Sequence, residues 1–280
     1  MASIGQRNAL QIRREATPGF YLDGENLGEI LLPRRYIPEG TGPGDYVLVF
    51  IHRDSEDRLV ATTEIPSARV GEFASLRVIS VNPQLGAFLD WGLTKDLLLP
   101  IREQTKRVSV GETVVVYVLL DGQSDRIIAT TRLDSHLDRT PPAYEEGQKV
   151  SLLVAGETPL GYKAIVENAH WGLLFKSDLG TALSIGQTLD GYVKTVRPDG
   201  KIDLSLTQAG YGRVRSLTEE ILDALQKNNG RLAVSDGSSP EEIREQFATS
   251  KKAFKQALGS LYRKRLIRLT DSGIEVVEPS

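Results

Sequence analysis

The stretch GAFLDWGLTKDLLLP at residues 86–100 has a second copy in GFYLDGENLGEILLP at residues 19–33. In both copies 14 residues lead from the first glycine to the proline, and a further 11 lead to another glycine, Gly44 or Gly111. GDYVLVFI and RLVATTEI then follow in one copy, and GETVVVYV and RIIATTRL in the other. Four matched blocks at nearly constant spacing indicate an internal repeat.

A third and more diverged copy keeps the same spacing, with 14 residues from Gly161 to Phe175 and 11 from there to Gly186. Its last two blocks are GQTLDGYV and KIDLSLTQ. Apolar and polar residues alternate in all three copies, and the β-branched and aromatic residues that favour strands are common. Because such short strands cannot bury a face alone, about five per copy should close into a small OB-type barrel.

The chain changes character after about residue 212, where the period of its apolar residues becomes about 3.6. SLTEEILDALQKNNG at 216–230 predicts a helix, and SSPEEIREQF at 238–247 predicts a second one with a capping box. A third helix should begin at Ser250, and a hairpin should turn around Asp271–Gly273. Helix, short strand, helix, helix and hairpin is the order of a winged-helix domain.

The sequence therefore predicts a mainly β fold with an α+β C-terminal part, in which three tandem OB-fold barrels precede a winged helix. Short ordered connectors are expected at 142–148 and 208–216, where turn residues gather without a long polar linker. The expected domains are three barrels and the winged helix, at residues 1–66, 67–140, 141–212 and 213–280.

Composition excludes several kinds of protein. No cysteine occurs among the 280 residues, which excludes disulfides and thiolate metal sites. No apolar stretch reaches the roughly 18 residues of a membrane span, and the N-terminal residues lack a secretory signal. We therefore expect a cytoplasmic protein that makes no membrane contact.

Positive charge is concentrated near the C-terminus, although the formal net charge is −3. Residues 1–212 hold 22 basic and 27 acidic side chains, whereas residues 213–280 hold 12 and 10. Seven Lys or Arg and no Asp or Glu lie between Thr249 and Arg268. Such a cluster on a projecting helix can neutralise phosphates; the alternatives are a helix-dipole effect or a protein-docking role. The candidates for nucleic-acid contact in this helix are Lys251, Lys252, Lys255, Arg263 and Lys264.

Signs of catalytic chemistry are missing from the sequence. His52, His136 and His170 have no partner at zinc-ligand spacing, and no glycine-rich phosphate loop or nucleophile motif occurs. The carboxylates are scattered over turns and helix starts instead of being clustered for metal-assisted hydrolysis. We therefore expect no catalytic residue, no metal, no cofactor and no enzyme activity.

With these residues in view, the repeat resembles the S1 RNA-binding domain, an OB-fold family. The S1 signature is similar to GAFLD…LLLPIRE at 86–103 and to GYKAI…GLLFKSD at 161–178. Three S1-like barrels with a terminal winged helix are similar to the conserved virulence factor B family, and the likeness covers nearly the whole chain. It is carried by GAFLDWGLTKDLLLPIREQ, DRIIATTRLDSHL, ETPLGYKAIVENAHWGLLFKSDL, DGKIDLSLTQAGYGR and SKKAFKQALGSLYRKRLI.

The chain departs from the S1 signature at two positions. The usual histidine is replaced by Pro33, Pro100 and Phe175 in the three copies. The aromatic residue of the GAF block is kept as Tyr21 and Phe88, but the third copy has Lys163 there. Because the third copy combines Phe175 with the cations Lys163 and Lys176, it is expected to keep the more complete binding surface.

Aromatic and basic residues at matched repeat positions are the candidates for RNA contact, because OB folds stack bases on exposed rings while cations follow the phosphates. For each ring the alternative is packing in a barrel core or between domains. Trp91 and Trp171 lie near the same face and carry the same two interpretations. The candidates in the barrels are Tyr21, Arg34, Arg35, Phe88, Arg102, Lys163, Phe175 and Lys176.

The resemblance implies an RNA-binding protein that regulates gene expression after transcription, with single-stranded RNA as its partner. A second hypothesis is a transcription regulator whose winged helix reads duplex DNA. A third is a scaffold that contacts ribosomal or RNA-processing proteins. Winged helices that act on DNA commonly dimerise. Because no long dimerisation helix is left in this sequence once the domains are assigned, the second hypothesis is less favoured than the first.

Overall fold

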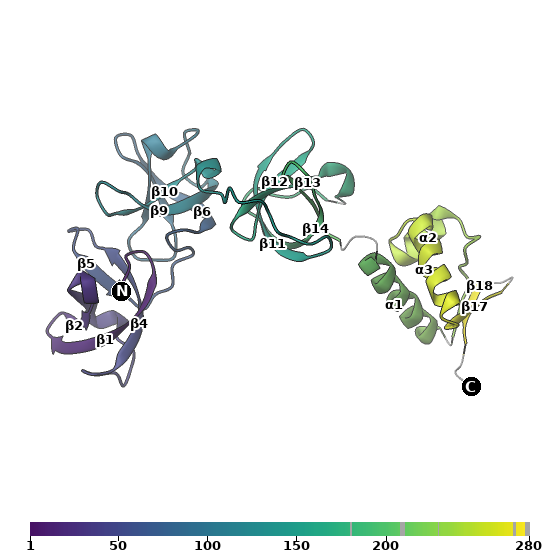
Figure 1. The fold of residues 1–280 in the computed structure, drawn as a ribbon, viewed down its shortest axis with the longest axis horizontal. Helices are drawn as coiled ribbons and strands as arrows, with labels where there is room; N and C mark the ends of the chain where they lie inside the picture. The colour runs from purple at the N-terminus through teal and green to yellow at the C-terminus, as the bar shows by residue number, and fades with distance from the viewer. Residues whose placement is uncertain (180, 208–210, 229, 271–272, 278–280) are drawn as a thin grey trace. The chain divides into compact units, whose positions relative to one another are not determined.

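The computed structural model describes residues 1–179, 181–207, 211–228, 230–270 and 273–277. Within these residues, three closed five-stranded barrels precede three helices and a three-stranded sheet (Figure 1). The predicted fold of three OB-type barrels and a winged helix is therefore confirmed. By its contacts the chain divides into two units, residues 1–141 with 151–189 and residues 142–150 with 190–280.

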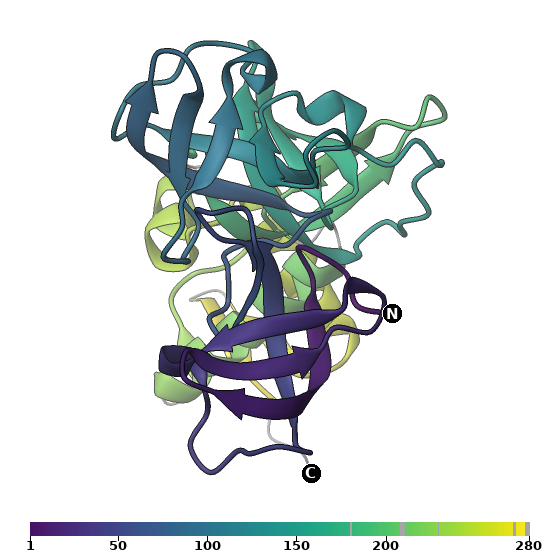
Figure 2. The same cartoon turned by 90° about the vertical axis from the view of Figure 1, so that its left-hand side faces the viewer.

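Barrel 1 shows the topology that all three barrels share. Its strands follow the order β1-β2-β3-β5-β4, and Figure 2 brings the purple strands β1, β2 and β3 of this barrel to the front. Neighbouring strands are antiparallel except β3 and β5, which pair in parallel through Leu31 and Val60. The five strands are β1 (Arg7–Ala16), β2 (Gly19–Asp23), β3 (Glu29–Pro33), β4 (Tyr46–Arg53) and β5 (Leu59–Thr62).

Barrels 2 and 3 repeat this arrangement. In each barrel a short 3-10 turn follows the third strand: η2 (Arg34–Tyr36), η3 (Ile101–Glu103) and η5 (Lys176–Asp178). Barrel 2 consists of β6 (Phe73–Asn82), β7 (Gly86–Asp90), β8 (Leu97–Pro100), β9 (Thr113–Leu120) and β10 (Ile127–Thr130). Barrel 3 consists of β11 (Lys149–Glu157), β12 (Gly161–Val166), β13 (His170–Phe175), β14 (Thr188–Val196) and β15 (Ile202–Ser205).

The repeated glycine opens the second strand of every barrel, where the next strand crosses very closely. A Cβ atom on Gly19 would lie 2.1 Å from the carbonyl oxygen of Leu32, and one on Gly86 would lie 2.2 Å from that of Leu99. In barrel 3 the corresponding distance is 1.9 Å. The backbone φ angles of Gly19 and Gly86 are also +150° and +141°. Glycine is therefore required here by space as well as by conformation.

The winged helix has the predicted order of elements. A capping box opens α2, in which the Ser239 hydroxyl accepts from the Glu242 amide and the Glu242 carboxylate accepts from the Ser239 amide. Phe254, Ile221 and Ile243 are fully buried in its core. The elements are α1 (Tyr211–Lys227), β16 (Arg231–Leu232), α2 (Pro240–Phe247), α3 (Lys251–Arg263), β17 (Ile267–Thr270) and β18 (Gly273–Val276).

Two expected segments lie partly outside the described residues. Residues 208–210 of the expected connector are not described, and residues 211–216 belong to α1, which begins five residues before the predicted start at Ser216. The apolar stripe of this helix begins only at Leu217, so the periodicity carried no signal for its first residues. Residues 271–272 of the predicted hairpin turn are also not described.

No helix in the described part of the chain combines the length and the apolar character that crossing a membrane requires.

Candidate nucleic-acid interface

The ring positions of the repeat lie on the outward face of each barrel. Tyr21, Phe88 and Lys163 are each partly exposed and alternate along their strands with buried neighbours. None of the three belongs to a barrel core, so core packing does not account for Tyr21 or Phe88. Across the sheet they face equivalent leucines in the pairs Tyr21–Leu31, Phe88–Leu98 and Lys163–Leu173. The second and third strands of an OB fold form the face that binds oligonucleotides.

The candidate cations that follow the third strands are exposed and paired with carboxylates. Arg34, Arg102 and Lys176 lie in the 3-10 turns η2, η3 and η5. Such exposed pairs contribute little to stability, but they cancel charge that a phosphate would otherwise meet. Arg35 lies with its guanidinium 4.7 Å from the centroid of the neighbouring Tyr36 ring. The ion pairs are Arg34–Glu15 at 3.5 Å, Arg102–Asp121 at 2.8 Å and Lys176–Glu157 at 2.6 Å.

In barrel 1 a cation covers the candidate ring. The guanidinium carbon of Arg14 lies 3.9 Å from the centroid of the Tyr21 ring. Glu29 holds this guanidinium by two hydrogen bonds, of 2.7 and 3.2 Å. The hydrogen bond from Arg14 also lowers the pKa of the Glu29 carboxyl group, so the pair is charged at neutral pH. The Tyr21 ring therefore already has a partner on one face.

In barrel 3 the lysine at the ring position covers a different ring. The Lys163 ammonium lies 3.8 Å from the centroid of the Trp171 ring and 3.2 Å from an oxygen of Asp134, in η4 (Leu133–Ser135). The Trp171 indole N–H donates to the same oxygen at 2.7 Å, and this bond, followed by the one from Lys163, lowers the pKa of Asp134. The sequence favoured barrel 3, but the structure gives carboxylate partners to both of its candidate cations, Lys163 and Lys176. Phe175 ends β13, partly exposed and opposite Gly161.

Barrel 2 leaves its ring uncovered by charge. Phe88 faces Ser80 on one neighbouring strand and Leu98 on the other. Among the described residues, no Lys or Arg lies over the Phe88 ring. The turn between β6 and β7 exposes a further apolar residue of this barrel, Leu85, which is 54% accessible. Barrel 2 therefore presents an apolar face of the kind on which a base can stack.

Trp91 packs between barrels 1 and 2 and is not available to a base. Its side chain is buried, and its ring meets that of Phe50 edge-on at 5.7 Å. Its indole N–H donates to the carbonyl oxygen of Lys95 at 2.6 Å. Phe50, from barrel 1, belongs to the hydrophobic core of barrel 2. Of the two interpretations of Trp91, packing between domains is the correct one.

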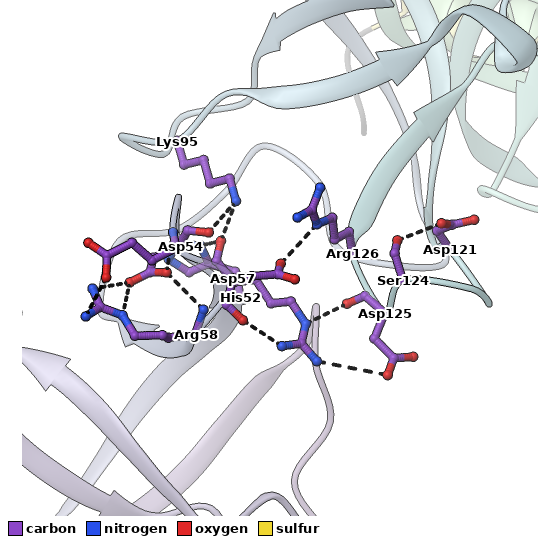
Figure 3. Close-up of polar contacts among 11 residues, drawn as sticks. His52, Asp54, Asp57, Arg58, Lys95, Asp121, Ser124, Asp125 and Arg126 are labelled. Atoms are coloured by element: carbon purple, nitrogen blue, oxygen red, sulfur yellow. Dashed lines mark hydrogen bonds and ion pairs between the residues drawn. The ribbon is translucent and has the colours of Figure 1, made fainter. Parts of the chain in front are cut away.

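The loops between the last two strands of barrels 1 and 2 bind one another (Figure 3). Arg126 of the barrel 2 loop bonds Asp57 of the barrel 1 loop at 3.0 Å, and this bond lowers the pKa of Asp57. The Lys95 ammonium donates to the backbone oxygens of Arg53 and Asp54 at 2.9 and 2.7 Å. OB folds also use this loop to bind oligonucleotides, so in these two barrels that part of the interface is engaged within the chain.

The basic cluster of the winged helix is the least neutralised of the candidate surfaces. The apolar face of α3 is buried through Phe254, Ala257, Leu258 and Leu261, so the opposite face meets solvent. Its only ion pair among the described residues is a long one, Lys255 to Asp236 at 3.9 Å. Of the remaining candidates, Lys251 is half-buried near the Gly237 carbonyl, Arg263 bonds the Gly259 carbonyl, and Lys252 and Lys264 are exposed.

Sequence reasoning missed the residues that decide which rings are covered. Arg14 and Ser80 occupy the same place opposite the ring, but a bulge in each first strand shifts the register just before them. Asp134 reaches barrel 3 from the end of barrel 2. Aligning the first strands of the repeat on the bulge could have identified Arg14 and Ser80, whereas nothing in the sequence pointed to Asp134.

No three His, Cys, Asp or Glu side chains come together in a metal-binding arrangement within the described ranges.

Two family models match the chain. The S1 domain model matches residues 4–64 and 70–132, which contain barrels 1 and 2, and the CvfB-like winged helix domain model matches residues 219–276. The S1 matches support nucleic-acid binding by this protein.

Relatives of similar length match most of the chain. The uncharacterized protein YitL of Bacillus subtilis is 28% identical over 92% of this chain and 89% of its own length. Conserved virulence factor B of Staphylococcus aureus strain USA300 is 24% identical over 84% of this chain and 80% of its own length. A crystal structure of a multidomain protein with nucleic acid binding domains from Streptococcus pneumoniae is 26% identical and covers 98% of both chains, with a TM-score of 0.44. The chain therefore carries two S1 domains followed by a CvfB-like winged helix, and over most of its length it is similar to conserved virulence factor B.

Proposed function

We propose that this protein binds single-stranded RNA and acts as a post-transcriptional regulator of gene expression. The observation that carries the proposal is the outward Phe88 ring on the oligonucleotide-binding face of an S1 barrel, over which no described Lys or Arg lies. Stacking on an aromatic ring suits unpaired bases, because only an unpaired base can present its face to a side chain.

The winged helix supplies a second contact in this proposal. The exposed cations of α3 meet few acids, so they are available to phosphates. Because the barrels and the winged helix belong to one chain, a strand held by one module meets the other at high effective concentration. Two weak contacts can therefore give useful affinity. We propose that the barrels and the winged helix both bind RNA and that neither catalyses a reaction.

One observation favours duplex DNA as a second candidate. The basic cluster lies on the third helix of the winged helix, which is the position that enters the major groove in helix-turn-helix proteins. In that case the barrels would contribute little, and the Phe88 ring would have no function in binding.

Binding of labelled single-stranded RNA and of duplex DNA of equal length at matched salt tests the proposal. We expect RNA to bind more tightly, and Phe88→Ala to weaken RNA binding by about 1–3 kcal/mol, the range for one stacked base. Tyr46→Ala is the matched control, because Tyr46 is a highly exposed ring on β4, away from the proposed face. Tighter binding of the duplex, with no effect of Phe88→Ala, would favour the DNA candidate instead.

A further inference from the structure

One end of the β12–β13 hairpin of barrel 3 is buried against barrel 2. Lys163 and Ile165 both point outward from barrel 3, because they alternate with core residues of β12. Lys163 is partly exposed, but Ile165 is only 1% exposed. Ile165 lines a cavity of about 420 Å³ together with Phe73 and Ser75 of barrel 2. By their contacts, residues 151–189, which contain this hairpin, belong to the same unit as barrels 1 and 2.

Asn168, in the turn between β12 and β13, bonds the segment where β6 of barrel 2 begins. Its side-chain oxygen accepts from the Phe73 amide at 2.6 Å, and its side-chain nitrogen donates to the Gly71 carbonyl oxygen at 3.1 Å. The φ angle of Asn168 is +56°, a left-handed conformation that asparagine adopts more readily than most residues. The Asn168 amide therefore anchors the turn of the hairpin on barrel 2 through both of its polar atoms.

Barrel 2 docks on barrel 1 through the same segment of the fold. The loop between its second and third strands, residues 91–96, packs Trp91 against Phe50 and extends Lys95 to two backbone oxygens of barrel 1. In both junctions, the connection between the second and third strands of the later barrel contacts the earlier barrel. Because these two strands form the oligonucleotide-binding face of an OB fold, each junction holds that face at one end.

The other end of the β12–β13 hairpin carries Phe175. This residue ends β13 opposite Gly161 and is partly exposed. Lys176 follows it as the first residue of the turn η5. A partly exposed ring at this place on an OB fold can stack an unpaired base. Because the two strands are paired along the whole hairpin, fixing the turn at Asn168 also restricts the movement of Phe175.

We infer that Asn168 is a positioning residue for RNA binding: it anchors the β12–β13 hairpin on barrel 2 and thereby holds Phe175 where a base stacks. The inference rests on the proposed RNA binding and adds to it a residue that acts through another side chain. A ring that is held in place before binding loses less conformational entropy when the base arrives. The anchored hairpin therefore binds RNA more tightly than the same hairpin without its anchor.

The variant Asn168→Gly tests the inference, because it removes both hydrogen bonds while glycine keeps the left-handed turn without strain. The probe is a fluorescein-labelled oligouridylate of about 32 nucleotides, long enough for two OB folds. We expect Asn168→Gly to weaken its binding by about two- to tenfold, the range that one hydrogen bond contributes. Phe175→Ala should weaken binding by about fivefold or more, the lower end for one stacked base.

Combined variants show whether Asn168 acts through Phe175. In the Asn168→Gly background, Phe175→Ala should weaken binding less than it does in the unchanged protein, because the ring is no longer held. Phe88→Ala should have the same effect in both backgrounds, since Phe88 lies on β7 of barrel 2. A general loss of stability would not distinguish the two rings in this way.

The matched control is Glu167→Gly in the same turn. Glu167 also has a left-handed φ angle, +49°, but its carboxylate accepts from the Ser151 amide within barrel 3 at 2.6 Å. This variant should not weaken binding, because it leaves the contact with barrel 2 intact and removes a negative charge. Asn168→Asp keeps an acceptor for the Phe73 amide, so it should bind more tightly than Asn168→Gly even though it adds a negative charge.

The outcomes distinguish the inference from the proposed function. If the unchanged protein fails to bind the oligouridylate, both fail. If the protein binds but Phe175→Ala has no effect, or Asn168→Gly weakens binding no more than Glu167→Gly does, only the inference is overturned. The same holds if the losses for Asn168→Gly and Phe175→Ala simply add. Circular dichroism checks that each variant is folded, and if Asn168→Gly does not fold, the same combinations with Asn168→Asp decide.

Discussion

The basic face of α3 makes a quantitative prediction about salt. Lys252, Lys255 and Arg263 lie opposite the buried face of this helix, and their only described carboxylate partner is Asp236, 3.9 Å from Lys255. If each cation meets one phosphate of a single strand, each contributes about −0.7 to the slope of log affinity against log salt. Replacing all three with alanine should therefore flatten the slope by about 2.

The size of this effect is large enough to measure. Between about 50 and 200 mM salt, a slope difference of about 2 corresponds to a roughly sixteenfold difference in how far the affinity falls. Fluorescence anisotropy of labelled single-stranded RNA across a salt series gives both slopes. The affinity of the unchanged protein should fall more steeply as the salt concentration rises. The triple variant should bind more weakly at low salt, but its affinity should fall less over the same range.

A control with the same charge change separates contact from long-range attraction. It replaces three exposed barrel lysines that are already paired with carboxylates, so their loss should change the slope little. An equal slope change in the two triple variants would refute phosphate contact by α3 and favour protein docking by this domain. The control residues are Lys106, Lys149 and Lys201, at 2.9, 2.7 and 2.7 Å from their partners.

Three further predictions concern stability. Trp91→Ala should lower the free energy of unfolding by about 3–5 kcal/mol, because it leaves a cavity against Phe50; a loss below about 1 kcal/mol in urea denaturation would contradict this. Gly86→Ala should cost more than Gly111→Ala, since a Cβ on Gly86 meets a carbonyl oxygen at 2.2 Å whereas one on Gly111 meets no atom within 4 Å; equal melting temperatures would disprove it. Asp134→Asn should destabilise the protein at neutral pH, because the lowered pKa of Asp134 means that its ionised form stabilises the fold above the ordinary value of 3.8. The difference in stability between the unchanged protein and Asp134→Asn should disappear as the pH falls through the lowered pKa. If acid denaturation shows a difference that stays constant with pH, the charge of Asp134 has no role in stability.

The fold could be predicted from sequence because its signals are local. Strand alternation, the period of the helices and the Ser239–Glu242 capping box all depend on residues that lie close together along the chain. The spacing of the repeat then required three similar barrels. The outward position of Tyr21 and Phe88 was one of two alternatives that the sequence left open, and the structure decided it by placing both rings on the partly exposed side of their strands.

The charges of the site could not be predicted in the same way. Arg102 and Lys176 looked available for phosphates, yet each has a carboxylate within 3 Å. Trp91 and Trp171 looked alike in sequence, yet one is buried between barrels and the other carries a lysine on its ring. In both cases the deciding neighbour is not an adjacent residue of the chain.

The sequence by itself determined the number, type and order of the domains. Only the tertiary structure decided which rings and cations are free. Arg14 meets Glu29 15 residues away on another strand, and Lys163 meets Asp134 29 residues away in another barrel. The physical reason is that hydrogen bonds and ring contacts act over a few ångströms of space, and that distance is set by strand register and barrel packing, not by separation along the chain.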